Sequence, residues 1–289
     1  MRKKLNKIVN RINNYLYKYI SKQKKTELTK PMIYGLLPGG KKVRSKILFD
    51  IGSIFNVDKK KILQVAAAVE CIHAYSLIHD DLPCMDNDNM RRGKLTTHKK
   101  FSESTAILAG NSLLTIAFQI LSEKSLNLDK QKKIKLINLI SESSGHTGIA
   151  GGQFLDLSYE KIRKTKKQVI DMQIKKTGKL FSFCCVAPII MSGKIKYTKK
   201  FNKIGNEIGL LFQIADDLID LRGKTSSAGK KTKKDFKMGK ATLISLLGTN
   251  NTIKYADNLK LKIFKSLKIF GKKGDDFRET INYILNRTK

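Results

Sequence analysis

A short aspartate-rich segment is the first part of this 289-residue chain that is suited to chemistry. Residues 79–88 (HDDLPCMDND) place four carboxylates within nine residues, those of Asp80, Asp81, Asp86 and Asp88. Carboxylates at this density repel one another unless water or a cation lies between them. Oxygen ligands without paired His or Cys suit a hard ion such as Mg²⁺. The segment predicts a magnesium site, and a solvated acidic helix end is the alternative.

Helix geometry sets a condition on this first cluster. The preceding residues (VAAAVECIHAYSLI) form an apolar helical pattern. If the helix continued, Asp86 would lie about 240° around the axis from Asp80, so the two could not share an ion. Pro83 allows the helix to end or bulge near Leu82. We expect such a break to return Asp86 to the Asp80 side.

A second aspartate cluster lies at the end of another predicted helix, in QIADDLID at 213–220. Asp216 and Asp220 are four residues apart and share a helix face, and Gln213 joins that face three residues earlier. No Lys or Arg lies three or four residues from Asp216, although lysine is abundant. Two such clusters, each followed by a basic loop, are suited to clamping a diphosphate through Mg²⁺.

Basic residues accompany both clusters. The segment 39–44 (GGKKVR) opens a helix, and a helix N-terminus with basic side chains suits an anion. Gly35–Lys42 nearly matches a nucleotide-binding P-loop but lacks its Ser or Thr and a preceding strand. Arg91 and Arg92 follow the first cluster, and His73 lies two turns before Asp80. The alternatives are that Arg91 and Arg92 belong to a solvated basic loop and that His73 is a core histidine.

Charge and cysteine content bound the class of protein. The formal charge is +34, spread over the whole length and dominated by Lys. The simplest interpretation is a general compositional bias; nucleic-acid binding and attraction of a small anionic substrate are the alternatives. The four Cys form no C-x-x-C pair, so we expect a reducing cytoplasm. The longest apolar stretch, Leu180 to Met191, is too short to span a bilayer, and we expect no membrane span.

Helical periodicity dominates the chain, and no segment alternates convincingly as a strand. With no Trp and four Pro, long helices are expected. The predicted helices cover 3–20, 41–55, 60–81, 102–123, 131–144, 166–192, 199–221, 240–248, 251–269 and 276–287. The breaks fall at 35–40, 83–100, 145–152, 193–198 and 222–239. One domain over residues 1–289 is the simplest organisation.

Taken together, these motifs resemble the trans-isoprenyl diphosphate synthases (the polyprenyl synthetase family). The matching pieces run from residue 37 to residue 248, and the long first motif resembles the bacterial farnesyl type. They are LPGGKKVRS, AAAVECIHAYSLIHDDLPCMDNDNMRRGKLTTH, GGQFLDL, KTGKL, GLLFQIADDLID and GKKTKKDFKMGKATLISLLG. The resemblance implies an all-α isoprenoid synthase fold, a single-domain helical bundle around a deep central cavity, usually as a homodimer.

The resemblance also assigns roles. It implies that two or three Mg²⁺ ions are bound by Asp80, Asp81, Asp86, Asp216, Asp217 and Asp220. It implies that the allylic diphosphate is bound by Arg91, Lys176, Thr177, Gln213, Lys230 and Lys240. It implies that isopentenyl diphosphate is bound by Lys41, Arg44, His73 and Arg92. The catalytic residues implied are Asp80, Asp81, Asp86, Asp216 and Lys176.

The implied reaction joins isopentenyl diphosphate to dimethylallyl and geranyl diphosphate, giving (2E,6E)-farnesyl diphosphate. The bulky Tyr75, five residues before the first aspartate, favours stopping at fifteen carbons, and Ser76 leaves room for the second addition. The chain departs from the family pattern at five positions, which we expect to affect rate or stability rather than reaction class. These are Asn87, Asn89 and Asn111 in place of Asp, Lys42 in place of Arg, and Ser45 in place of Pro.

Other interpretations remain open. Geranyl and geranylgeranyl diphosphate are alternative products. An HD-type phosphohydrolase, suggested by His79-Asp80, would need further metal-binding histidines, and His73, His98 and His146 are not convincingly placed. A basic helical protein that binds nucleic acid is the non-enzymatic alternative. It would bind with steep salt dependence, and it leaves the two aspartate faces unexplained.

Overall fold

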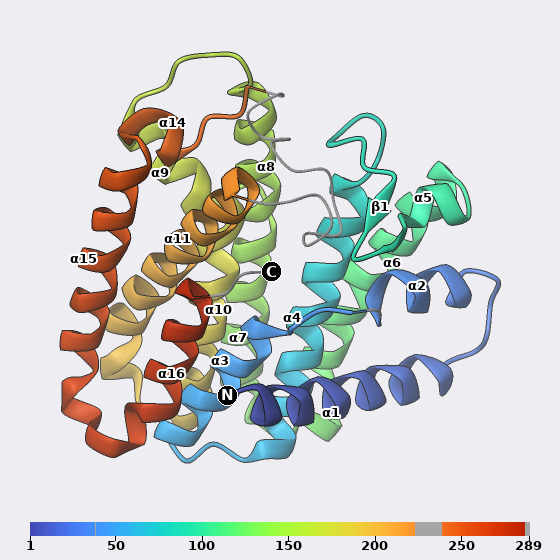
Figure 1. Ribbon diagram of the computed structural model, residues 1–289. Helices are drawn as coiled ribbons and strands as arrows, with labels where there is room; N and C mark the ends of the chain where they lie inside the picture. The colour runs from blue at the N-terminus through green and yellow to red at the C-terminus, as the bar shows by residue number, and fades with distance from the viewer. Residues whose placement is uncertain (38, 223–238, 287–289) are drawn as a thin grey trace. The chain divides into compact units, whose positions relative to one another are not determined.

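The computed structural model describes residues 1–37, 39–222 and 239–286. Helices make up most of this part of the chain (Figure 1), and its one sheet is a two-stranded hairpin. The expected all-α fold is confirmed. The chain divides into two compact units, one of residues 1–49 and 58–137, the other of residues 50–57 and 138–289. A single domain with a central cavity remains a prediction.

The first unit is built around two long apolar helices. Its elements are α1 (Arg2–Ser21), α2 (Thr29–Leu36), α4 (Lys59–Asp80), β1 (Met90–Arg91), β2 (Lys94–Leu95), α5 (Thr97–Lys100), α6 (Glu103–Ser122) and the 3₁₀ turn Lys124–Leu126. Two further helices, α3 (Val43–Ile54) and α7 (Lys130–Ser144), each contain a boundary between the units.

Helix α4 carries the first aspartate cluster at its C-terminus, and its start is well defined. The carboxylate of Asp58 accepts hydrogen bonds from the backbone N–H groups of Lys60 and Lys61, as an N-cap does. Its other end packs closely on α6 (Figure 1), where a Cβ added to Gly110 would lie 2.2 Å from Nε2 of His79. His79 also contacts the carbonyl of Ile107 at 3.1 Å. The last turn of α4 is therefore fixed in direction.

The second unit is built around α10, a helix buried along nearly its whole length. Its elements are α8 (Ile149–Ser158), α9 (Lys166–Gln173), a π-helical segment (Ile174–Gly178), α10 (Lys179–Ser192), the 3₁₀ turn Ile195–Tyr197, α11 (Thr198–Arg222), α14 (Leu243–Leu247), α15 (Thr249–Leu267), the 3₁₀ segment Lys268–Gly274 and α16 (Asp275–Leu285). The apolar stretch Leu180–Met191 is thus a core helix.

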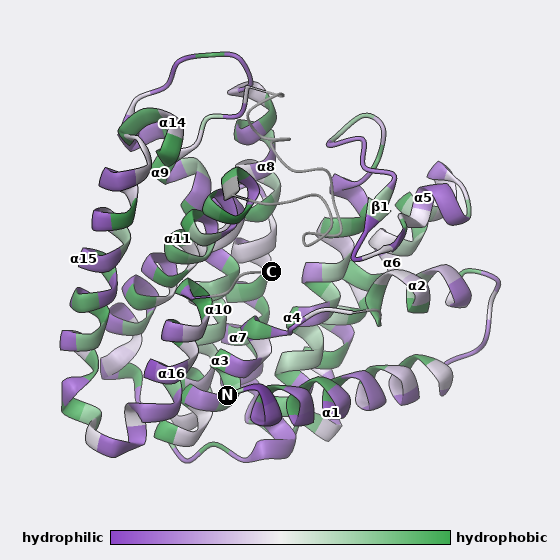
Figure 2. Cartoon of the chain, viewed as in Figure 1, coloured by the Kyte–Doolittle hydropathy of each residue, from purple (hydrophilic) through white to green (hydrophobic). Residues whose placement is uncertain are grey.

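Close packing and amphipathic faces assemble this second unit. A Cβ on Gly209 of α11 would lie 2.3 Å from Cα of Gly178, so only glycine lets α11 approach the π-helical segment there. Helix α15 shows polar and apolar patches alternating along its coil (Figure 2). Its buried residues recur every three or four positions, the spacing of a single helix face; they are Thr252, Ala256, Leu259, Ile263 and Leu267.

Two helices, α4 and α6, are long and apolar enough to cross a membrane by length and composition alone. In the tested windows, 72% of α4 and 44% of α6 are buried within the protein. Core helices of soluble proteins share these properties, and α4 and α6 pack against each other. The lower burial of α6 leaves part of its apolar surface exposed, including Ile107 and Leu108.

Several predicted boundaries need correction. The segment 83–100, expected to be loop, contains the hairpin and α5, because strands of two residues are too short to show periodicity. Helices α2 and α8 were both missed, because eight and ten residues give only two to three turns; α8 begins at Ile149, inside the expected break at 145–152. The expected single helix 166–192 is interrupted by the π-helical segment.

Candidate active site

The chain turns back sharply after α4, as the position of Pro83 predicts. The helix ends at Asp80, with Asp81 as its C-cap. The backbone N–H of Asp86 then donates to the carbonyl of Asp80 at 2.8 Å, and that of Asp88 donates to the carbonyl of Asp81 at 3.1 Å. Asn87 takes the left-handed conformation (φ +50°) that this turn requires and that Asn tolerates. The expected return of Asp86 to the Asp80 end is confirmed.

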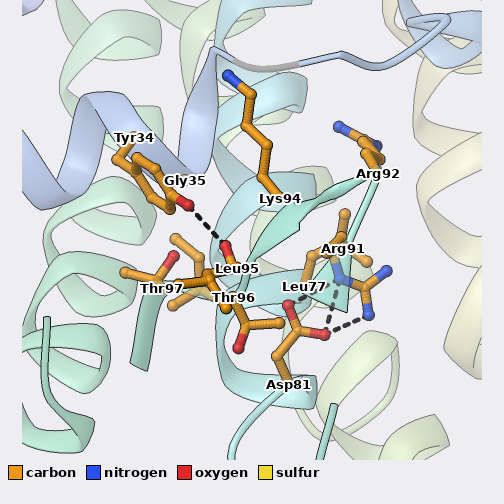
Figure 3. Close-up of a pocket in the computed structure, with 11 residues that line it drawn as sticks. Tyr34, Gly35, Leu77, Asp81, Arg91, Arg92, Lys94, Leu95, Thr96 and Thr97 are labelled. Carbon is orange, nitrogen blue, oxygen red and sulfur yellow. Dashed lines mark hydrogen bonds and ion pairs between the residues drawn. The ribbon is translucent and has the colours of Figure 1, made fainter. Parts of the chain in front are cut away.

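Arg91, on strand β1 of the hairpin, forms an ion pair with Asp81 (Figure 3). Its Nε lies 2.7 Å from both carboxylate oxygens, and its Nη2 also bonds Oδ1. Asp81 is 3% exposed, whereas Asp80 and Asp86 are only partly buried. In this structure Asp81 positions Arg91 beside the cluster, and Asp80 and Asp86 are the carboxylates with access to solvent.

The hairpin turn orients the neighbouring arginine. Arg91 pairs with Lys94, so Arg92 and Gly93 form the two-residue loop. Both have positive φ, +53° and +77°, as a type I′ turn requires. Nothing lies within 4 Å of a Cβ added to Gly93, so glycine serves the conformation rather than the packing there. The turn therefore holds Arg91 and Arg92 in fixed, different directions.

A cluster of cations surrounds His73 in the first unit. Nη1 of Arg44 lies 3.4 Å from Nε2 of His73. The guanidinium of Arg92 lies against Gly40, where an added Cβ would be 2.8 Å from Nη1. Desolvation, followed by the charges of Arg44 and Arg92, holds the pKa of His73 well below 6.5. The structure thus brings Arg44, His73 and Arg92 together, with Lys41 next to Gly40, and an anion would relieve this repulsion.

A buried carboxylate ties the two helices that carry this cluster. Glu70 of α4 is 4% exposed and lies one turn before His73. Lys42 Nζ lies 3.4 Å from its Oε2, and the Ser45 hydroxyl donates to its Oε1. In the sequence, Lys42 and Ser45 were noted as departures from the family pattern, and Glu70 was given no role. A lone Glu in an apolar helix was the available signal.

Tyr75 and Ser76 both lie buried in α4, each 8% exposed. The Tyr75 ring packs edge-on against His79 with centroids 5.7 Å apart. Burial, followed by the charge of Asp80, raises the pKa of Tyr75 to about 12. Tyr75 thus lies buried in the last turns of α4, against His79, which directly precedes Asp80. The Ser76 hydroxyl donates to the carbonyl of His73 at 3.0 Å.

The second cluster is organised by a polar network inside the second unit. Nε2 of Gln213 donates to Oδ1 of Asp217 at 2.8 Å, and the Thr177 hydroxyl donates to Oε1 of Gln213 at 3.2 Å. Gln213, expected on the face of Asp216, bonds Asp217, which lies four residues further along the same helix. Asp217 is 5% exposed, Asp216 is exposed and Asp220 is partly buried.

Lys176 and Lys240 converge on one carboxylate that sequence reasoning left without a role. Nζ of Lys176 lies 2.6 Å, and Nζ of Lys240 lies 3.1 Å, from Oδ2 of Asp156. Asp156 comes from GGQFLDL in α8, a stretch noted only for its resemblance. Among the expected ligands of the allylic diphosphate, Lys230 lies outside the described residues.

Two cavities adjoin these residues, one in each unit. The second unit has a cavity of about 860 Å³, lined in part by Asp217, Asp220 and Lys240. The first unit has a small one of about 40 Å³ between α2, the end of α4 and the hairpin (Figure 3). The larger cavity brings two expected magnesium ligands and an expected diphosphate ligand to one surface.

Magnesium suits the donors at both helix ends. In the described ranges, no three His, Cys, Asp or Glu side chains lie close enough together to hold a metal ion. Mg²⁺ usually takes only one or two carboxylates and completes its shell with water and substrate phosphates. Asp80 and Asp86, joined through the turn, and the accessible Asp216 and Asp220 fit this pattern.

Comparisons with known proteins agree on one family. The family described as Polyprenyl synthetase matches residues 25–282. Farnesyl diphosphate synthase from Micrococcus luteus is 40% identical over 257 residues, which is 89% of this chain and 88% of that protein. The apo FPP/GFPP synthase from Zymomonas mobilis is 35% identical with a TM-score of 0.87, covering 98% of this chain and 100% of that one. The geranyltransferase from Helicobacter pylori complexed with magnesium and isoprenyl diphosphate is 29% identical with a TM-score of 0.81, covering 98% and 96%. The chain belongs to the polyprenyl synthetase family, as its aspartate motifs predicted.

Proposed function

We propose that this chain is a farnesyl diphosphate synthase, which adds isopentenyl diphosphate first to dimethylallyl and then to geranyl diphosphate. The observation that carries the proposal is the cation cluster around His73, two turns from Asp80 on the same helix. One helix thus presents an anion site and a metal-binding end. The 40% identity with a farnesyl diphosphate synthase supports the same reaction.

The cation cluster is proposed to bind the diphosphate of isopentenyl diphosphate. Arg44 and Arg92 present planar guanidinium groups, which suit phosphate oxygens. The low pKa of His73 leaves the ring neutral at neutral pH, so it offers one N–H donor rather than a charge. Lys41 adds a further cation from the start of the same segment. Binding of the negatively charged substrate then offsets the electrostatic repulsion among these cationic side chains.

The allylic diphosphate is proposed to be bound by Lys176, Lys240, Gln213, Thr177 and Lys230, and the family resemblance adds Arg91 to this set. Two or three Mg²⁺ ions would be held by Asp80, Asp86, Asp216 and Asp220, with Asp81 and Asp217 behind them. Bound Mg²⁺ supplies positive charge that stabilises the departing diphosphate.

The protein groups act by binding, orientation and exclusion of water. The basic side chains stabilise charge on the diphosphate as its bond to the allylic carbon breaks. The resulting allylic cation is attacked by the double bond of isopentenyl diphosphate, and the proton then lost passes to the released diphosphate. Water must be excluded, because it would trap the cation. We further propose a cytoplasmic homodimer. The exposed apolar side chains of Ile107 and Leu108 on α6 support a subunit contact there.

The test is to incubate the protein with labelled isopentenyl diphosphate, dimethylallyl diphosphate and Mg²⁺, and to size the dephosphorylated products. A fifteen-carbon product is expected. Ten- or twenty-carbon products would retain the reaction class but reject the farnesyl assignment. Absence of any elongation by folded protein would reject the function.

A further inference from the structure

Asp156 is a buried carboxylate that two expected substrate ligands share. It is 6% exposed, and Lys176 and Lys240 both bond the same oxygen, Oδ2, at 2.6 and 3.1 Å. Burial alone would raise the pKa of Asp156, but the charges of the two lysines and their hydrogen bonds hold it below its ordinary value. Asp156 is therefore ionised at neutral pH and serves as the common counter-ion of two ammonium groups.

The backbone around this contact leaves little freedom. Gly152, one turn before Asp156 on α8, lies against the π-helical segment, and an added Cβ would be 2.1 Å from the backbone nitrogen of Lys176. The helix carrying the carboxylate is thus packed directly on the segment carrying one lysine. A π-helical segment is uncommon and often occurs at functional sites. Here it places Lys176 beside α8 and the neighbouring Thr177 on Gln213.

The shared carboxylate offsets the charge repulsion between the two lysines in this geometry. Two ammonium groups bonded to one oxygen lie close enough to repel each other strongly in a partly buried site. Asp156 offsets part of this repulsion and thereby favours the arrangement in which the side chains of Lys176 and Lys240 lie together. Each ammonium has three N–H donors, so one bond to Asp156 does not by itself use up its capacity to bind phosphate oxygens.

We infer that Asp156 is a positioning residue for the allylic diphosphate: it holds Lys176 and Lys240 as a preformed pair that receives one diphosphate group. The inference rests on the proposed function and extends it to a residue outside the expected set. The carboxylate does not touch the reacting atoms; it acts through the two lysines.

The decisive variant is Asp156→Asn, which keeps the size and removes the charge. Affinity for inorganic diphosphate and for geranyl diphosphate alone, each with Mg²⁺, is measured by calorimetry. We expect a loss of about tenfold, the size associated with losing a charge-assisted hydrogen bond. In steady-state assays the KM for geranyl diphosphate should rise by a similar factor, with the KM for isopentenyl diphosphate within about twofold.

Two further variants separate positioning from a general structural effect. Asp171→Asn removes the exposed carboxylate that lies 2.9 Å from Nζ of Lys175, four residues on, and should leave both affinities unchanged. Asp156→Glu keeps the charge and should recover part of the affinity. It also carries the test if Asp156→Asn folds poorly, as judged by circular dichroism and thermal unfolding.

A double-mutant cycle tests whether Asp156 acts through a lysine. In a Lys240→Gln background, Asp156→Asn should lower diphosphate affinity by clearly less than it does in the unaltered protein. Unchanged or tighter diphosphate binding by Asp156→Asn, or an equal loss for isopentenyl diphosphate, would overturn the inference. If the unaltered protein makes no prenyl product, the function fails, yet the binding of inorganic diphosphate still decides the role of Asp156.

Discussion

The backbone N–H of Asp86 donates a 2.8 Å hydrogen bond to the carbonyl oxygen of Asp80. This bond closes the turn that replaces the next turn of α4. It brings two carboxylates to the same end of the helix, whereas a continuous helix would have separated them by about 240°. Asp81, between them in the chain, is turned inward onto Arg91. The turn thus leaves Asp80 and Asp86 accessible to solvent and Asp81 buried.

The first prediction concerns the accessible aspartates. Asp80→Ala and Asp216→Ala should each lower the rate of chain elongation by about a hundredfold or more. Each removes a proposed Mg²⁺ ligand, and the stabilisation of the departing diphosphate by Mg²⁺ would be worth several kcal/mol. Elongation is measured with labelled isopentenyl diphosphate, and helix content by circular dichroism should not change. Asp129→Asn, at an exposed carboxylate paired with Lys132, is the matched control and should retain full activity. Near-normal elongation by both alanine variants would refute the site.

Sequence reasoning reached the turn after α4 because its cause is local. Pro83 lacks a backbone N–H and disfavours helical geometry at the residue before it, so the break could be placed within a residue or two. Helices α1, α4, α6 and α11 were located for the same reason, since an apolar face sustained over about five turns is visible in the chain alone.

Contacts between distant segments were beyond the sequence. The bonds of Lys176 and Lys240 to Asp156 depend on how α8 packs against the π-helical segment, and the contact at Gly152 that fixes this packing leaves no periodic signal. The hydroxyl of Thr177 in the π-helical segment donates to Gln213 of α11, a contact that likewise depends on how the two segments pack. Both contacts join residues that are distant in the sequence, so no local pattern could indicate them.

The second prediction concerns Glu70, which joins the start of α3 to α4. Glu70→Gln leaves Lys42 buried without its counter-ion and should destabilise the protein by about 3 kcal/mol or more. Ser45→Ala removes a single hydrogen bond and should cost about 1 kcal/mol. Urea unfolding measures both. Because Arg44 and His73 sit on the two joined helices, the KM for isopentenyl diphosphate should rise more than that for geranyl diphosphate.

A matched change checks that prediction. Lys42→Met with Glu70→Gln removes both charges, so it should be more stable than Glu70→Gln alone. If Glu70→Gln were as stable as the unaltered protein, the carboxylate would have no structural role.

The third prediction follows from the depressed pKa of His73. An unfolded histidine titrates near pH 6.5, and desolvation followed by the Arg44 charge lowers the folded value well below that. Below pH 6.5 the unfolded chain therefore binds more protons than the folded protein. The stability associated with neutral His73 is complete above about pH 6.5 and is lost as the pH falls towards the folded pKa.

His73→Gln removes this titration and keeps a hydrogen-bonding side chain. Between pH 7.5 and pH 5.5, the unaltered protein should lose about 1 kcal/mol more unfolding free energy than the variant. The measurement is urea unfolding across that range. His146→Gln, at an exposed histidine, is the control and should follow the unaltered protein. Parallel pH curves for His73→Gln and the unaltered protein would contradict the prediction.

The fourth prediction concerns product length. Tyr75 is buried beside His79, and the charge of Asp80 contributes to its raised pKa, so its ring occupies space next to the proposed metal-binding end of α4. Tyr75→Ala opens that space, and the main product should shift from fifteen towards twenty or more carbons. Ser76→Phe adds bulk one residue further on and should shift it towards ten. Radiolabelled products, dephosphorylated and separated by chain length, give the distribution.

Stability must be controlled in this experiment, because Tyr75→Ala leaves a void that costs about 3 kcal/mol or more. Assays are therefore run well below the measured unfolding temperature of each variant. Tyr75→Phe keeps the ring and loses only the hydroxyl, so it should give the unaltered fifteen-carbon product. The opposite directions expected for Tyr75→Ala and Ser76→Phe separate a steric limit from general damage, which would lower the rate without moving the distribution. An unchanged distribution in both variants would show that this turn of α4 does not set product length.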